Sequence, residues 1–401
     1  METLLPFNQH SNELIFYNKK SSFVQQHNQQ LFPIGSGHYP LYVQQNLLMP
    51  NELALANTDF SIVLMDLNLQ GQVASFQKEA FHTDKINALK FSNDHTNQHL
   101  QHVIESASQD GTVKIWDRRS GEAVSTLRHQ NSPFYSVDTN KSIICAGTNS
   151  ELVFWDIRKM KPPLFTYKSS HTDDVTGLAY HPENPDSLIS CSTDNLMCQF
   201  DFAGKENPQL EDETLEGVYC SSQPLINCGF LNKDMIWAIT SINTIEIINL
   251  ENLDVFTKVE KFPHQADYVI GCEQDRFTSK FAIYAGNNKG ELYIYELEDK
   301  NKLNLVDMIL LPQNPELPHD NIIRNTLRIN SDQIVLTTEN GDLKIFKYSP
   351  EQAQAQNVKS QALELQQLIS DNNIEEDEDE DANQMYIGKK KNQNAKKYKP
   401  F

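Results

Sequence analysis

Histidine, serine and aspartate recur in one order at two places in the chain, and this is the side-chain set that hydrolases use for nucleophilic catalysis. The first set is His82, Ser106 or Ser108, and Asp110; the second is His171, Ser190 or Ser192, and Asp194. A catalytic triad is made once in a protein, whereas a structural device is repeated. We therefore interpret both sets as buried hydrogen-bonded networks and predict that the chain is not an enzyme.

The first set belongs to a stretch that reads as paired β-strands. Ser106–Arg119 contains an Asp110-Gly111 turn, which is a hairpin signal because glycine tolerates a positive φ. Upstream, Phe81-His82 opens the unit and a strand-like run follows at Ile86–Phe91. The unit closes on Trp116-Asp117.

This order of His, two strands, Asp-Gly turn and Trp-Asp resembles the WD40 repeat, a four-stranded propeller blade. The resemblance implies a tetrad in which Asp110 accepts a hydrogen bond, His82 relays, Ser106 or Ser108 bridges, and the Trp116 N–H donates. The pattern decays in later repeats. Phe200 stands at the Trp place, Asn149 and Asn340 stand at the Asp place, and so does Lys289.

Seven such units can be counted between residues 41 and 350, and we predict an all-β, seven-bladed WD40 β-propeller. A single blade cannot bury both faces of its sheet, so the blades must stack into a ring. No outer strand follows the last unit. We expect residues 1–40 to supply it through Glu13–Tyr17, with Phe23-Val24 as a weaker run. Residues 351–370 are predicted to form a short helix, and residues 371–401 a disordered acidic and then lysine-rich tail.

Composition and charge restrict the function. Residues 371–401 contain eight acidic residues and six lysines, so the remaining 370 residues carry a net charge of −18 out of the total of −20. An acidic body repels nucleic-acid phosphates and suits a basic protein partner.

The start of the chain has no secretory signal pattern, and no apolar run is long enough to predict a membrane span. The six cysteines form no C-x-x-C pair, so we predict buried thiols, no metal and no cofactor.

One region is similar to a specific family within the WD40 proteins. Ser142–Thr148, Leu152–Arg158 and His171–Thr176, together with His181-Pro182-Glu183-Asn184-Pro185, resemble the WD repeat-containing protein 89 family. The likeness is weaker over the first, second and sixth units. It supports the fold more than it specifies a function.

A second resemblance concerns a partner. Trp116–Arg119 and Trp155–Arg158 both fit the W-D-x-R ending of WD40 proteins that dock on the cullin-4 ubiquitin-ligase adaptor. The full motif requires an apolar residue where Glu105 stands, and the third unit departs at Cys145 and Asn149. The alternative reading is that Arg119 and Arg158 each pair with a neighbouring acid.

Partner-binding residues are expected on the face formed by the loops before the first strand and after the second strand of each blade. Phe134 and Tyr135 are the candidate aromatic pair, and Asp174 is a further candidate. Both aromatic residues could instead belong to the core of their blade.

The lysine-rich end has three readings: a nuclear import signal, an RNA-contacting arm, or a tail that only aids solubility. Its residues are Lys389, Lys390, Lys391, Lys396, Lys397 and Lys399. We predict a monomeric, non-enzymatic scaffold within a larger complex, nuclear or nucleolar, that docks basic clients in ribosome assembly or chromatin. A cytoplasmic location and a role as a cullin-4 substrate receptor are the alternatives.

Overall fold

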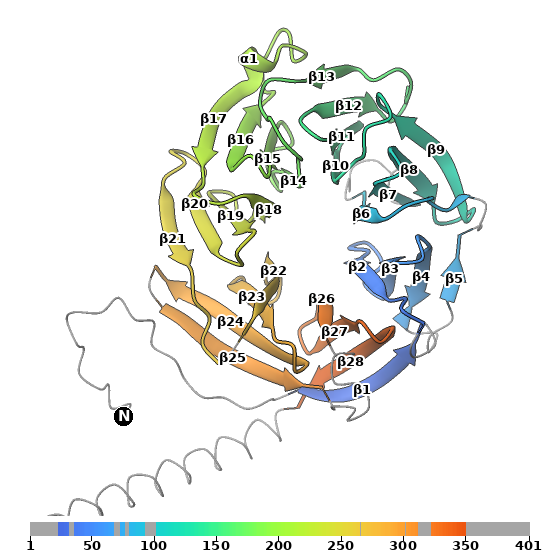
Figure 1. Cartoon of the computed structure of the whole chain (residues 1–401), viewed down its shortest axis with the longest axis vertical. Coiled ribbons are helices and arrows are strands. Elements are labelled where there is room, and N and C mark those ends of the chain that lie inside the picture. The colour runs from blue at the N-terminus through green and yellow to red at the C-terminus, as the bar shows by residue number, and fades with distance from the viewer. Residues whose placement is uncertain are drawn as a thin grey trace, which may run out of the picture. The chain divides into compact units, whose positions relative to one another are not determined.

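A computed structural model of the chain describes residues 23–31, 36–67, 73–76, 80–92, 102–264, 266–300, 302–311 and 322–349. Within these residues the strands form seven antiparallel sheets of four strands each. The sheets are arranged as blades around a common centre (Figure 1), with the first strand of each blade innermost. The predicted seven-bladed propeller is confirmed.

The strands follow the chain blade by blade. Blade 1 contains β2 (Pro40–Gln45), β3 (Glu52–Asn57), β4 (Ile62–Asp66) and β5 (Val73–Ser75). Blade 2 contains β6 (Ile86–Phe91), β7 (Val103–Ser108), β8 (Thr112–Asp117) and β9 (Glu122–Arg128). Blade 3 contains β10 (Ser136–Asn140), β11 (Ile143–Gly147), β12 (Leu152–Asp156) and β13 (Phe165–Tyr167). Blade 4 contains β14 (Gly177–Tyr180), β15 (Ser187–Cys191), β16 (Leu196–Asp201) and β17 (Leu215–Cys220), with the one-turn helix α1 (Glu211–Thr214) before β17.

Blades 5 and 6 repeat this plan, and blade 7 completes the ring. Blade 5 contains β18 (Leu225–Phe230), β19 (Met235–Thr240), β20 (Ile245–Asn249) and β21 (Val255–Val259). Blade 6 contains β22 (Tyr268–Gln274), β23 (Phe281–Gly286), β24 (Glu291–Asp299) and β25 (Lys302–Leu310). Blade 7 contains β26 (Ile323–Asn330), β27 (Gln333–Thr338), β28 (Asp342–Tyr348) and, as its outer strand, β1 (Phe23–Gln30).

The closing strand does come from the N-terminal segment, but the expected residues were wrong. β1 pairs antiparallel with β28 from Phe23↔Tyr348 to Gln30↔Asp342 (Figure 1). Glu13–Tyr17 lies outside the described residues. An outer strand is held mainly by backbone hydrogen bonds, so a polar stretch rich in Gln can take the place that the more apolar run was expected to fill.

The apolar core is divided among the interfaces between neighbouring blades. One cluster joins Ile115 and Leu127 of blade 2 to Ile144 and Trp155 of blade 3, and all four side chains are buried. Another cluster joins blade 1 to blade 7 and so closes the ring. Burying one such side chain contributes about 1.5–3 kcal/mol, so each blade is stabilised by its two neighbours.

The predicted helix at 351–370 and the tail at 371–401, with all its lysines, lie outside the described residues. Among the described residues, no helix has the length and apolar character to cross a membrane.

Candidate functional site

The antiparallel register places the candidate residues at two opposite ends of the blades. In blade 2, β7 ends at Ser108, the turn contains Asp110, and β8 runs away from it to Asp117. One end of the blades contains the turns equivalent to Asp110 and the loops before the first strands. We call this end the Asp-turn face. The end with Trp-Asp and the loops between first and second strands is the Trp-Asp face. Gly111 has a φ of 75°, as the hairpin signal at Asp110-Gly111 requires.

A continuous hydrogen-bonded chain runs through blade 2. Nδ1 of His82 lies 2.9 Å from Oδ2 of Asp110, and Nε2 of His82 lies 2.7 Å from Oγ of Ser106. The indole N–H of Trp116 donates to the same Ser106 oxygen at 2.8 Å. Ser106 is therefore the bridging serine. Ser108 instead donates to the carbonyl of Asp84 and accepts from the backbone N–H of Asp110.

The electrostatics of this chain suit a fixed structural role. Burial lowers the pKa of His82, so the imidazole is neutral and Nδ1 can carry the proton toward Asp110. Burial alone would raise the pKa of Asp110, but hydrogen bonds from His82, Thr112 and the Thr83 backbone hold it well below its usual range. The Ser106 hydroxyl belongs to a fully buried residue, so a substrate cannot reach it.

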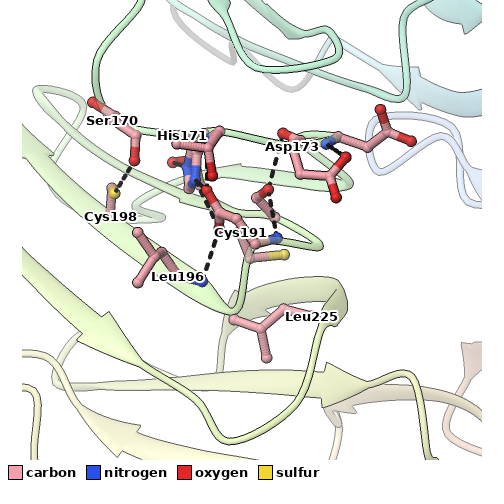
Figure 2. A network of polar contacts seen from close by, with 12 residues as sticks. Ser170, His171, Asp173, Cys191, Leu196, Cys198 and Leu225 are labelled. Atoms are coloured by element: carbon pink, nitrogen blue, oxygen red, sulfur yellow. Dashed lines mark hydrogen bonds and ion pairs between the residues drawn. The ribbon is translucent and has the colours of Figure 1, made fainter.

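Blade 4 repeats this geometry with one member missing (Figure 2). Nδ1 of His171 lies 3.1 Å from Oδ2 of Asp194, and Nε2 lies 2.7 Å from Oγ of Ser190. Phe200 is fully buried at the Trp position and offers no N–H to the serine. Ser192, like its counterpart Ser108, holds the loop by donating to the carbonyl of Asp173 at 3.0 Å.

A profile of the WD domain, G-beta repeat family matches residues 74–117 and 161–201, which are the two segments that contain these networks. The chain therefore contains WD40 repeats over these two segments. A WD40 propeller is generally a scaffold for protein interactions.

The chain has relatives that match different shares of its length. It is 25% identical over 338 residues to WD repeat-containing protein 89 homolog of Dictyostelium discoideum, which covers 81% of this chain and 88% of that protein. It is 31% identical over 206 residues to WD repeat-containing protein GTS1 of Arabidopsis thaliana, covering 48% and 51%. It is 26% identical over 209 residues to histone acetyltransferase type B subunit 2 of Candida glabrata, covering 49% and 48%. The chain thus spans about half the length of the last two.

Phe134 was a candidate for partner binding with a core position as the alternative, and the structure places it in the core. It is fully buried, and its ring centroid lies 5.9 Å from that of Trp155 in the core between blades 2 and 3. Tyr135, the next residue, is only partly buried and remains on the Asp-turn face.

The structure brings Tyr135 and Asp174 together on the Asp-turn face. Burial first, and then the Asp174 carboxylate, raises the pKa of the Tyr135 hydroxyl. Burial likewise raises the pKa of Asp174, with Asp173 adding to the effect and the Tyr135 hydroxyl opposing it. An aromatic ring beside a carboxylate is a suitable contact for a cationic side chain.

Arg119 and Arg158 lie at the opposite, Trp-Asp face. Each guanidinium folds back on the aspartate two residues earlier: Arg119 on Asp117 at 2.7 Å and Arg158 on Asp156 at 2.5 Å. The two arginine side chains are 59% and 74% exposed. They therefore cannot form one site with Tyr135 and Asp174.

A groove between blades 3 and 4 was missed by the sequence reasoning. Ile143, Phe165 and Phe202 are among the residues that line it, and they are far apart in the sequence. The available signal was the series of aromatic residues in these two blades, among them Phe154 and Tyr180. Within the described residues, no group of His, Cys, Asp or Glu is arranged to hold a metal ion, and all six cysteines are free.

Proposed function

We propose that this scaffold docks basic proteins in ribosome assembly or chromatin, that it acts in the nucleus, and that it does so without catalysis. The observation that carries the proposal is the acidic charge of the chain before its tail, since the first 370 residues have a net charge of −18. A surface of one sign attracts partners of the opposite sign and accelerates their association.

The Asp-turn face supplies local contacts of the same kind. Asp84 and Asp173 are exposed there, close in sequence to the two networks, and Tyr135 lies with Asp174. Carboxylates beside a tyrosine ring can bind a lysine or arginine through both charge and the ring face. The rigid His82 and His171 networks hold the loops that carry these acids.

One relative guides the choice of clients. The Candida glabrata protein is described as a subunit of a histone acetyltransferase. Histones are strongly basic, and so are most ribosomal proteins, so both classes fit an acidic surface. If the lysine-rich end is an import signal, it supports the nuclear location. Its alternative roles are contact with RNA and an aid to solubility.

The cullin-4 alternative depends on Arg119 and Arg158. Their exposure leaves both side chains accessible to an adaptor. Each guanidinium already makes a bidentate ion pair with its own aspartate, and a partner would have to compete for these donors. This observation favours the client scaffold over the ligase receptor.

The test is affinity purification of the tagged full chain from cells, beside a chain that ends at Ser370 and the double variant Arg119→Ala/Arg158→Ala. The proposal expects histones or ribosomal proteins with the full chain and with the double variant. Loss of these clients on truncation would assign a part of the docking to the tail. Recovery of a cullin adaptor that disappears in the double variant, without basic clients, would overturn the proposal.

A further inference from the structure

A preformed groove lies between blades 3 and 4 on the Trp-Asp face, with a volume of about 440 Å³. Such a volume is within the range of ligand sites, about 300–1,000 Å³. Its walls are mostly apolar and aromatic: Phe154, Leu164, Phe165, Tyr180, Phe202 and Pro208. The groove is distinct from the acids of the Asp-turn face, which lie at the opposite end of the blades.

The rings that form the walls are held by one another. The Phe154 ring stacks on Phe165 with centroids 4.5 Å apart, and it meets Phe202 edge-on at 5.9 Å. Phe154 itself is fully buried, so the wall is anchored in the core. Leu164 is 46% exposed at the groove, although a large apolar side chain usually gains from burial. Leu164 is continuous with the aromatic wall, and an apolar patch of this kind, unlike a single exposed side chain, is typical of an interaction site.

The turns at the end of the groove are also fixed before any partner arrives. The Asn140 side-chain amide donates to the carbonyl of Pro185 at 2.6 Å, which links blade 3 to blade 4. Lys141 and Asp186 form an ion pair across the same gap at 3.1 Å. A rigid pocket loses little conformational entropy when a side chain enters it.

The charges around the groove favour a basic occupant. Lys141 and Arg158 are neutralised by Asp186 and Asp156. The loop before blade 3's outer strand adds two exposed bases, Lys159 and Lys161. Residues 201–216 of blade 4 include Pro208 of the groove wall, and this segment is strongly acidic. It contains one basic residue, Lys205, and six acidic ones: Asp201, Glu206, Glu211, Asp212, Glu213 and Glu216.

We propose that this groove binds a segment of a basic partner protein by inserting an apolar anchor side chain between Leu164 and the aromatic wall. The basic residues that flank the anchor lie over the acidic segment 201–216. The inference rests on the proposed function, because it names a surface and a recognition chemistry for the same basic clients. It adds a requirement for an apolar anchor, which charge attraction alone does not impose.

The test uses short fluorescent lysine-rich peptides that carry one tryptophan, and a matched set with serine in its place. Fluorescence anisotropy with the full chain should show the tryptophan peptides binding about tenfold more tightly. Leu164→Gln should abolish this preference. Val124→Gln, which changes a 54% exposed valine on the outer strand of blade 2, should retain it.

A charge-matched pair of variants tests the acidic segment. Asp212→Lys/Glu213→Lys should weaken the tryptophan peptides about tenfold. Glu122→Lys/Glu251→Lys, with the same change in net charge on blades 2 and 5, should have a much smaller effect. Equal binding of both peptide sets, or binding of neither, would overturn the groove as the site. The purification of clients from cells decides the proposed function separately.

Discussion

Glu105 is a buried carboxyl group whose replacement should stabilise the protein. It lies on β7 with no exposed surface, and neither of its oxygens makes a hydrogen bond within the described residues. Burial raises its pKa from 4.5 to about 8, and only weaker effects of Thr139 and Lys90 act to lower it. At neutral pH the folded protein therefore keeps Glu105 protonated, whereas the unfolded chain ionises it.

The magnitude follows from the linkage between proton binding and folding. Between pH 4.5 and about 8 the folded state binds more protons than the unfolded state, so stability falls as pH rises. Each pKa unit corresponds to about 1.36 kcal/mol. Relative to a neutral side chain of the same shape, Glu105 should therefore cost about 3 kcal/mol at pH 7 and nothing near pH 4.5.

Glu105→Gln should thus be more stable than the parent chain at pH 7 and equally stable near pH 4.5. The assay is urea unfolding at a series of pH values, followed by tryptophan fluorescence. Glu246→Gln is the matched control, since Glu246 is equally buried but accepts hydrogen bonds from Tyr219 at 3.0 Å and Lys258 at 2.6 Å. That control should be destabilised. A difference between Glu105→Gln and the parent that does not grow with pH would refute the reasoning.

Three further predictions concern the other residues of the blades. Asp110→Ala should destabilise the protein by about 1–3 kcal/mol, because His82, Thr112 and the Thr83 backbone N–H lose the carboxylate that they share; an unchanged melting curve would count against this. Phe134→Ala should cost about 3–5 kcal/mol through a cavity beside Trp155, measured by urea unfolding, and a loss below 1 kcal/mol would place Phe134 outside the core. Arg119→Ala/Arg158→Ala should leave the melting temperature unchanged, since both ion pairs are exposed, and a clear drop would assign them a structural role.

The sequence was sufficient for the fold because its signals are local. The Asp110-Gly111 turn and the recurring order of His, Ser and Asp each fall within one blade, and they predicted the repeat and its network. The choice between Ser106 and Ser108 required the structure. The two serines are two residues apart and so lie on the same side of β7, which means that alternation along the strand cannot separate them. Only the structure shows that Ser106 meets His82 and Trp116, whereas Ser108 bonds to the Asp84 carbonyl.

The features that the sequence missed depend on contacts between blades or on the backbone. Phe134 is buried beside Trp155 of its own blade in the cluster that blades 2 and 3 form together, and the sequence alone left its surface and core positions open. The closing strand is Phe23–Gln30 because its backbone pairs with β28, and apolar content is a poor guide to that. The groove combines residues from β10 to the segment before α1, so it exists only after blades 3 and 4 have packed.

The most direct test of the central claim is the affinity of the full chain for purified core histones and ribosomal proteins over a range of salt concentrations. The account predicts binding that weakens steeply with salt, and a further loss when Asp84→Lys/Asp173→Lys reverses charge on the Asp-turn face. Binding that is absent at low salt, or that responds to neither salt nor this charge reversal, would contradict a scaffold for basic clients.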